Sequence, residues 1–341
     1  MTTTQTSVVH DLGTLAHRLS HPARTPCVCE PPQVLADRPD GTVVRSGAIV
    51  AKAHAADTDR EALTARIALA AAPQLAGILL PPLTAPEPAA PTARPVTLWP
   101  LGAPVDPTDP GAAPWAEAAD LLARLHRTEP PFPLPPMRGP AKAARAVARM
   151  RAALRGDAIT PPRDPAVEPG DATAPPRDPA ALSVLAGWRA LPAWARGEAP
   201  APAPGADALC HGDLHLGQLV RHPAPDGPWL LIDMDDAGVG DPAWDLGRPA
   251  AWYAAGLLAP EHWSTFLDAY RAAGGPAVPA DGDPWPALDV PARALTVQTA
   301  AVALAKCAAE QRDPDDHEQL MIESCARIAT LPPELATGPA S

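Results

Sequence analysis

The stretch of residues 208–247 constrains this chain more than any other part of the sequence. Two short apolar runs lie in it: the first ends in a His-Gly-Asp turn at Asp213, and the second, residues 229–232, ends at Asp233. Apolar runs this short, bounded by Gly, Pro and Asp, are typical of buried strands separated by a turn. The sequence therefore predicts two strands that each deliver a carboxylate, and we expect the two carboxylates to face one cleft.

A pair of acids in one cleft suits phosphoryl transfer. This reaction needs a group that orients the substrate hydroxyl or accepts its proton, and oxygen ligands for the Mg²⁺ that accompanies the nucleotide. Protein kinases meet both needs with an Asp, an Asn shortly after it and a further metal-binding Asp. Gln218 lies five residues after Asp213, and Asp233 follows. The chain therefore keeps the order and spacing of these three kinase residues, with Gln in place of Asn.

The sequence HGDLHLGQ at residues 211–218 resembles the catalytic loop of the aminoglycoside phosphotransferase and choline kinase family, and its Gln looks like the maltokinase branch. The segment GDPAWDL, residues 240–246, is similar to the GDP-x-x-DL segment downstream in that family. The resemblance implies an α+β, two-lobed protein-kinase-like fold, with a small antiparallel-sheet N-lobe and a larger, mostly helical C-lobe. It also implies ATP or GTP as the phosphoryl donor and Mg²⁺ as the metal.

The resemblance gives the residues of this loop their expected roles. Asp213 accepts the proton of the acceptor hydroxyl or orients that hydroxyl, and His211 holds the catalytic loop through hydrogen bonds. Asp233 binds Mg²⁺, with Gln218 as the second ligand because a hard cation prefers carboxylate and amide oxygen. Alternation in an extended segment puts Asp235 on the same side as Asp233, which makes it either an auxiliary metal ligand or an exposed side chain.

The N-terminal part of the chain supplies the nucleotide side of the expected site. Lys52 ends the last of three predicted strands, where a kinase keeps the Lys that binds the nucleotide phosphates; the alternative is a solvated Lys on an edge strand. Glu61, in a helix predicted over 57–72, is either the acid that pairs with Lys52 or an exposed helix carboxylate. Trp99 and Leu101 lie where the last N-lobe strand runs into an interlobe hinge. The resemblance places adenine contacts there, although Trp99 is alternatively a core residue. The three strands are predicted at 34–36, 42–45 and 48–52.

The pattern predicts two lobes and one irregular segment. We expect an N-lobe over residues 1–98, a C-lobe over 99–341 and a flexible Pro- and Ala-rich insertion at about 156–180. A basic helix at 141–155 is typical of a solvated face. The other helices are predicted at 8–20, 114–127, 181–196, 246–258, 261–274, 291–311 and 314–330.

Composition excludes some partners. A formal net charge of −12 argues against a nucleic-acid-binding surface, which needs a basic stripe. The five cysteines form no even framework, and the sequence shows no apolar run of membrane-spanning length and no secretory leader. We therefore expect a cytoplasmic protein with reduced thiols that does not enter a membrane. The sequence does not indicate an oligomeric state.

These observations predict an ATP- or GTP-dependent, Mg²⁺-requiring kinase that phosphorylates a hydroxyl of a small molecule. An antibiotic such as an aminoglycoside is the first acceptor class, and a sugar or amino sugar is the second. An acid-rich acceptor pocket would favour the polycation, whereas neutral hydrogen-bonding side chains and a stacking Trp would favour the sugar. Acids of the C-terminal helices are candidates to meet a cation, with solvated helix caps as the simpler explanation: Asp281, Asp283, Asp289, Glu310 and Asp313.

A protein of a different class remains an alternative. The chain lacks a Gly-x-Gly-x-x-Gly loop and has Gln218 in place of Asn, which are features that a non-catalytic nucleotide-binding or partner-binding protein on the same scaffold would tolerate. Lys52, Asp213 and Asp233 are all present, and their retention favours the enzyme.

Overall fold

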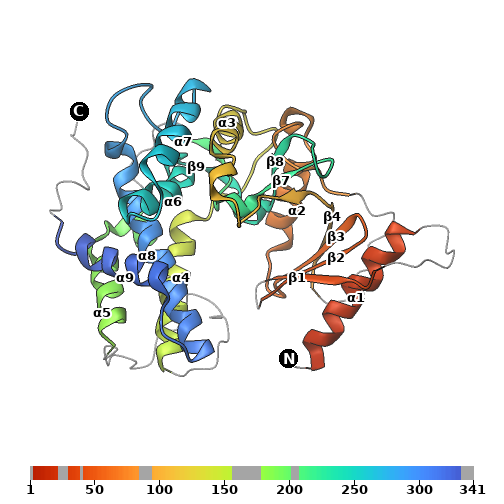
Figure 1. Cartoon of the computed structure of the whole chain (residues 1–341), viewed down its shortest axis with the longest axis horizontal. Coiled ribbons are helices and arrows are strands. Elements are labelled where there is room, and N and C mark those ends of the chain that lie inside the picture. Colours follow the sequence, from red (N-terminus) through yellow and green to blue (C-terminus); the bar gives the residue numbers. More distant parts are fainter. Residues whose placement is uncertain are drawn as a thin grey trace.

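A small antiparallel sheet forms the N-terminal lobe (Figure 1). Its four strands lie in the order β1-β2-β3-β4, and α1 packs across β2 and β3. Residues along β2 alternate between half-buried and buried, the two-residue period of a strand with one covered face. The bounds are α1 (Thr3–Ser20), β1 (Gln33–Arg38), β2 (Gly41–Ser46), β3 (Ile49–His54) and β4 (Val96–Pro100). The computed structural model describes residues 3–21, 30–38, 41–83, 94–155, 178–200 and 207–331.

Helix α2 (Arg60–Ala70) connects this sheet to the rest of the molecule. Asp59 is its N-cap, and its carboxylate accepts hydrogen bonds from two backbone N–H groups of the first turn. The buried Leu69 near the end of α2 belongs to the large core of the C-terminal lobe, not to the core of the sheet. The end of α2 therefore packs against the C-terminal lobe.

Two small sheets hold the ends of the 208–247 stretch together. One has the order β5-β7-β8, and the other pairs β6 with β9; all the pairs are antiparallel. The strands are β5 (Ala103–Pro104), β6 (Ala208–Cys210), β7 (Leu219–Arg221), β8 (Trp229–Leu231) and β9 (Gly238–Gly240). Because β8 and β9 follow each other in the chain while β6 pairs with β9, both predicted acidic turns come to the same region.

The C-terminal lobe is mostly helical (Figure 1). The long helix α8 packs against α4, α5, α6 and α9, while α3 packs on α7. These helices are α3 (Trp115–His126), α4 (Gly139–Arg155), α5 (Pro179–Ala190), α6 (Ala243–Ala254), α7 (Pro260–Ala272), α8 (Trp285–Glu310) and α9 (Asp316–Ile328). The two-lobed α+β architecture predicted from the sequence is thereby confirmed.

Two predicted boundaries were wrong. Helix α8 begins at Trp285 rather than near residue 291, because a Pro in its first turn costs no hydrogen bond and the interior Pro291 is buried in the helix packing. Helix α5 ends at Ala190, and a short 3₁₀ turn follows Pro192. The predicted insertion at 156–180 lies outside the described residues except at its end, where α5 begins. None of the described helices has the length and apolar character that a membrane span requires.

Candidate active site

The turn before Asp213 can be formed only with glycine at position 212. Gly212 has φ +83°, and a Cβ atom there would lie 2.2 Å from the backbone oxygen of Asp236. Both the left-handed conformation and the lack of space exclude a side chain. This close approach places the backbone of the first acidic turn directly against the second.

Asp245, at the start of α6, holds the same turn in place through hydrogen bonds. Its buried carboxylate accepts hydrogen bonds from the backbone N–H groups of His211 (2.6 Å) and Gly212 (2.7 Å) and lies 3.0 Å from Nε2 of His126. Burial alone would raise the pKa of Asp245, but these hydrogen bonds outweigh it and the pKa lies below its ordinary value. His126, Cys210 and Asp245 lie close enough to suggest a metal cluster, yet their polar atoms are already used in tying the loop to α3, α6 and β9.

His211 is fully buried and serves the loop rather than a substrate. Its Nε2 lies 2.9 Å from the backbone oxygen of Ile232, and its Nδ1 accepts from the backbone N–H of Asp213 at 3.4 Å. The ring therefore joins the end of β8 to the turn that carries Asp213. These are loop-holding contacts of the kind that the resemblance implies, and the positioning role of His211 remains a prediction.

Asp213 lies between two cations that the sequence did not indicate. Arg248 of α6 reaches Oδ1 of Asp213 at 2.5 Å, and Lys142 of α4 reaches Oδ2 at 2.5 Å. Burial would raise the pKa of Asp213, but the charges of Lys142 and Arg248 lower it below its ordinary value. Asp213 is therefore ionised at neutral pH, as a group that orients a hydroxyl or accepts its proton must be.

Asp233 stands at the second turn in a left-handed conformation, with φ +64°. Asp is one of the few side chains that adopts this conformation without a large penalty. Its carboxylate receives hydrogen bonds from Nζ of Lys52 at 2.6 Å and from Nε2 of Gln218 at 3.3 Å. The structure thus brings these three predicted residues together, although they come from β3, the loop before β7 and the end of β8.

Asp235 reaches the same lysine by a route other than the predicted one. Residues 234–236 form a 3₁₀ turn instead of the extended segment assumed from alternation. Oδ2 of Asp235 nevertheless lies 2.9 Å from Nζ of Lys52 and 3.1 Å from Nδ1 of the buried His54. Burial would lower the pKa of Lys52, but Asp233 and Asp235 together raise it above its ordinary value. Lys52 is thus charged and partly buried, and it joins the lobes.

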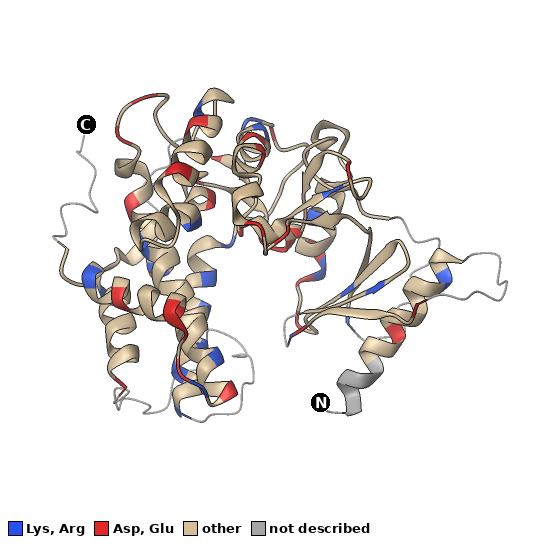
Figure 2. Cartoon of the chain, in the orientation of Figure 1, with Lys and Arg blue, Asp and Glu red and all other residues tan. Residues whose placement is uncertain are grey.

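The side chain of Asp236 lies on the other side of this turn from Lys52. Its carboxylate lies 2.7 Å from Nζ of Lys142 and 3.5 Å from Nε of Arg138. Lys142 therefore bridges Asp213 and Asp236. Figure 2 shows the acidic turn where the lobes meet, with basic residues along α4 beside it. The predicted solvated face of the 141–155 helix accordingly needs correction at Lys142, which faces the site.

For Glu61 the structure supports the second of the two predicted alternatives, an exposed helix carboxylate, and the adenine contact expected at Leu101 remains a prediction. Glu61 is exposed in the first turn of α2, and the ion pairs of Lys52 are made with Asp233 and Asp235 instead. The reason is the short interval between Lys52 and α2, which leaves the first turn of the helix away from the site. The backbone N–H of Leu101 already donates to Ala48 at 2.8 Å, so this residue can offer adenine only its carbonyl oxygen, which accepts from His222 at 3.2 Å.

Trp99 lies at the junction of the lobes. Its indole N–H donates to Oγ1 of Thr97 at 3.0 Å, and the ring is half-buried against the core of the C-terminal lobe. The core interpretation of Trp99 therefore has direct support. A contact with adenine remains a prediction.

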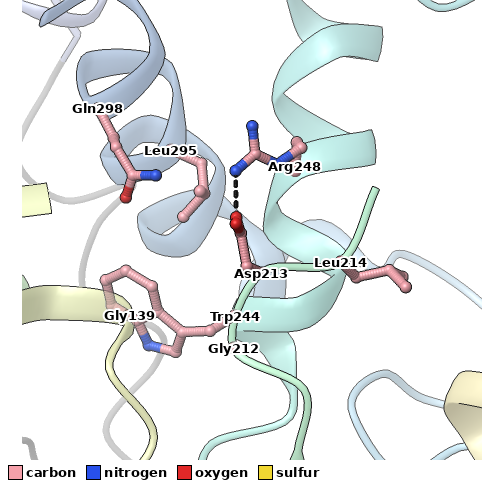
Figure 3. A pocket seen from close by; sticks show the side chains of 8 residues that line it. All are labelled: Gly139, Gly212, Asp213, Leu214, Trp244, Arg248, Leu295 and Gln298. Atoms are coloured by element: carbon pink, nitrogen blue, oxygen red, sulfur yellow. Dashed lines mark hydrogen bonds and ion pairs between the residues drawn. The ribbon is translucent and has the colours of Figure 1, made fainter. Parts of the chain in front are cut away.

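A narrow pocket opens beside Asp213 (Figure 3). Helix α6 contributes Trp244 and Arg248, and helix α8 contributes Leu295 and Gln298. The lining residues are Gly139, Gly212, Asp213, Leu214, Trp244, Arg248, Leu295 and Gln298. Asp213 is the only carboxylate among them, and it is already paired with Arg248.

The second turn has a donor set that suits Mg²⁺. Carboxylate and amide oxygens are the ligands that Mg²⁺ prefers. Asp233 and Asp235 both contact the ammonium of Lys52, and the side-chain amide of Gln218 contacts Asp233. The side chain of Asp233 is 36% exposed, so its carboxylate remains accessible to an entering ion. These residues fit the metal that the resemblance implies.

Sequence reasoning missed four residues that the structure places at the site. His54 could have been found, because it lies two residues after Lys52 and so shares its face of β3. Lys142, Arg248 and Gln298 carry no local signal. They lie on three different helices, and only tertiary packing brings them to Asp213.

Comparisons with known proteins bear on the fold and the family. The structure is similar to a choline/ethanolamine kinase family protein from Mesorhizobium loti, with a TM-score of 0.52, 18% identity, and 95% of this chain and 97% of that chain covered. It is similar to the choline kinase LicA from Streptococcus pneumoniae, with a TM-score of 0.53, 12% identity and coverage of 96% and 99%. It is also similar to a thermostable mutant of the aminoglycoside phosphotransferase APH(4)-Ia in a ternary complex with AMP-PNP and hygromycin B, with a TM-score of 0.53, 13% identity and coverage of 94% and 99%.

These likenesses show the fold alone, because all the identities are low. No curated protein matches the sequence significantly. The profile of the phosphotransferase enzyme family (APH) matches residues 41–288, which is well over half of the chain and includes both acidic turns. The chain belongs to the APH phosphotransferase enzyme family.

Proposed function

We propose that this small-molecule phosphotransferase transfers the γ-phosphoryl group of ATP or GTP, with Mg²⁺, to a hydroxyl group of its acceptor. The observation that carries the proposal is the proximity of two acidic turns: the turns that carry Asp213 and Asp233 are joined through His211, which contacts the backbone of Asp213 and of Ile232, the residue before Asp233. One carboxylate then serves the acceptor, and the other serves the metal and the nucleotide.

The residues of the chain divide this work. Lys52 binds the nucleotide phosphates, while Asp233, Gln218 and Asp235 hold the metal, which neutralises phosphate charge when bound. The transition state of phosphoryl transfer is loose, so positioning matters more than a strong base. A low pKa at Asp213 agrees with that task, because its carboxylate orients the hydroxyl and then accepts a proton as the bond to phosphorus forms.

The lining of the pocket bears on the choice between the two acceptor classes. The sequence favours an antibiotic such as an aminoglycoside, with a sugar second. Trp244, Gln298 and Arg248 favour the sugar class, because a polycation would meet Arg248 beside an already paired Asp213. The acids of the C-terminal helices offer no compensation where they are committed elsewhere: Asp283 accepts from the backbone N–H of Trp285, Asp289 pairs with Arg293, and Glu310 pairs with Arg312.

The maltokinase-like Gln218 supports the sugar class independently.

Reduced thiols support the expected cytoplasmic location, since the described cysteines, Cys210, Cys307 and Cys325, are all free.

Product formation tests the proposed function. A panel of sugars, amino sugars, aminoglycosides and choline is incubated with Mg²⁺ and either ATP or GTP, and phosphorylated product is detected by mass. We expect Asp213→Ala to lower turnover by about 10³-fold while nucleotide affinity is kept, because its carboxylate acts on the acceptor. The exposed Asp268→Ala on α7 is the matched control. A panel that yields no product with either nucleotide would instead favour the non-catalytic alternative.

A further inference from the structure

The acceptor side of the site carries a local excess of positive charge. Three cations, Arg138, Lys142 and Arg248, surround the two carboxylates of Asp213 and Asp236. Lys142 and Arg248 have side chains only 23% and 17% exposed, so both cations are partly withdrawn from bulk water. Arg248 lines the pocket, and Lys142 lies beside it on the other oxygen of Asp213. The chain as a whole has a formal charge of −12, and this positive region therefore stands out against its surroundings.

Two buried polar atoms at the pocket have no hydrogen-bond partner among the described residues. Gln298 is 4% exposed and lines the pocket, yet its Oε1 accepts no hydrogen bond; Nε of Arg248 likewise donates none. Figure 3 shows both side chains extending toward the centre of the pocket from α8 and α6. Burying a polar atom without a partner is costly, so these two atoms are open to a hydrogen-bonding partner that enters the pocket, either a water molecule or a ligand group.

We propose that the acceptor is a polyhydroxyl compound with a carboxylate, such as a sugar acid. Arg248 and Lys142 bind its carboxylate, and Oε1 of Gln298 accepts a hydrogen bond from one of its hydroxyl groups. This inference deepens the proposed function and rests on it. It predicts the reverse of the charge preference expected for an aminoglycoside.

On this proposal the reacting hydroxyl meets Asp213, whose two carboxylate oxygens are otherwise paired with Lys142 and Arg248. When the carboxylate of the acceptor takes over part of the pairing of Arg248 and Lys142, an oxygen of Asp213 is released to meet a neighbouring hydroxyl. In the transfer step the hydroxyl oxygen forms a bond to the γ-phosphorus, and the bond from that phosphorus to the β–γ bridging oxygen breaks. The nucleoside diphosphate leaves with that electron pair, and the hydroxyl proton passes to Asp213.

Three ring compounds that differ mainly in charge test this inference: D-glucuronate, D-glucose and D-glucosamine. Binding of each to the full-length protein is measured by calorimetry without nucleotide, so that the readout does not depend on turnover. We expect glucuronate to bind at least tenfold more tightly than glucosamine, with glucose between them. Equal binding of the three, tighter binding of glucosamine, or no detectable binding of glucuronate overturns the inference.

Matched variants assign the binding to the named side chains. Lys142→Met should weaken glucuronate binding about tenfold with little effect on glucose, and Lys142→Arg should restore most of it. Gln298→Leu should weaken all three compounds to a similar extent, because the hydroxyl contact is common to them. Arg149→Met, on an exposed position of the same helix, is the control. Glucuronate binding that is unchanged in Lys142→Met, in a variant whose thermal unfolding shows it folded, overturns the assignment.

The outcomes separate this inference from the proposed function. Phosphoryl transfer to a neutral sugar or an aminoglycoside, without glucuronate binding, overturns the inference and leaves the proposed function standing. Glucuronate binding that depends on Lys142, without transfer to any acceptor of the panel, supports the inference about the pocket and counts against the proposed function.

Discussion

At the residue scale, each of the two acidic turns depends on a residue with a left-handed backbone conformation. Gly212 has φ +83° and Asp233 has φ +64°. Asp233 tolerates this conformation at a cost of about 1 kcal/mol, whereas position 212 excludes any side chain because the Asp236 backbone lies against it.

Replacing Gly212 should therefore do far more damage than replacing another left-handed glycine. Gly212→Ala is expected to lower the free energy of unfolding by roughly 3 kcal/mol and to abolish transfer, because the turn must move away from Asp236. Gly256 is the control: it has φ +79° with no atom within 4 Å of an added Cβ, so Gly256→Ala should cost only about 1 kcal/mol. Urea unfolding of both variants measures the difference, and equal losses would contradict the assigned close contact.

His215 makes the free energy of unfolding depend on pH. Burial, and next the charge of Arg248, lowers the pKa of His215 to about 4. The unfolded chain binds a proton at this residue near its ordinary pKa of 6.5, so the folded state loses stability as the pH falls from 6.5 toward 4. In His215→Asn, the fall in the free energy of unfolding at low pH should be smaller by roughly 2 kcal/mol than in the wild type. Urea unfolding at pH 7 and pH 4.5 measures it; a loss of the same size in wild type and variant would rule out His215 as the cause.

At the element scale, α2 is attached to the C-terminal lobe by a buried side chain. Arg66 is 6% exposed, and its Nε donates to the backbone oxygen of Ala237 at 2.7 Å, just after the turn that carries Asp235 and Asp236. This contact, rather than a pair between Lys52 and Glu61, is the link from α2 to the metal side of the site.

Breaking that link should affect stability and nucleotide binding together. Arg66→Met keeps much of the length and apolar bulk but leaves the Ala237 oxygen without its donor, which should lower the free energy of unfolding by about 2 kcal/mol. Affinity for the Mg²⁺–nucleotide complex should fall as well, because the turn loses its support. Arg60→Met, exposed at the start of the same helix, is the control. Calorimetry of nucleotide binding that shows no difference between the two variants would exclude this role.

At the scale of the whole molecule, the lobes meet through charges. Lys52 and His54 of the N-terminal sheet contact Asp233 and Asp235 of the other lobe. A Mg²⁺–nucleotide complex that binds between these groups should stabilise both lobes at once, because it binds the folded state only.

Thermal unfolding with and without ligand tests this. At a ligand concentration of about 100 Kd, Mg²⁺–ATP or Mg²⁺–GTP should add about 2.7 kcal/mol to the stability of the wild type. Asp233→Ala should lose this gain, and so should the wild type in excess chelator, whereas Asp213→Ala should keep it. A full gain in Asp233→Ala would remove the metal-binding role from that residue.

Much of the fold was predictable because its signals are local. The alternation along β2, the apolar stripe of α3 and the turn residues around Asp213 are set within a few positions of the chain. The lower accuracy at helix ends has a non-local cause. Pro291 lies inside α8 because packing against the rest of the molecule outweighs the weak preference of a single residue.

The sequence by itself identified Lys52, Asp213, Gln218 and Asp233 as the candidates for the chemistry, from short motifs and the family resemblance that these motifs carry. Only the tertiary structure decided what these side chains touch. It pairs Lys52 with Asp233 and Asp235, and it brings Lys142 and Arg248 from two separate helices onto Asp213. The physical reason is that backbone periodicity and turn chemistry act over a few residues. The charge environment of a carboxylate depends instead on residues that are distant in the sequence and become neighbours only when the helices pack.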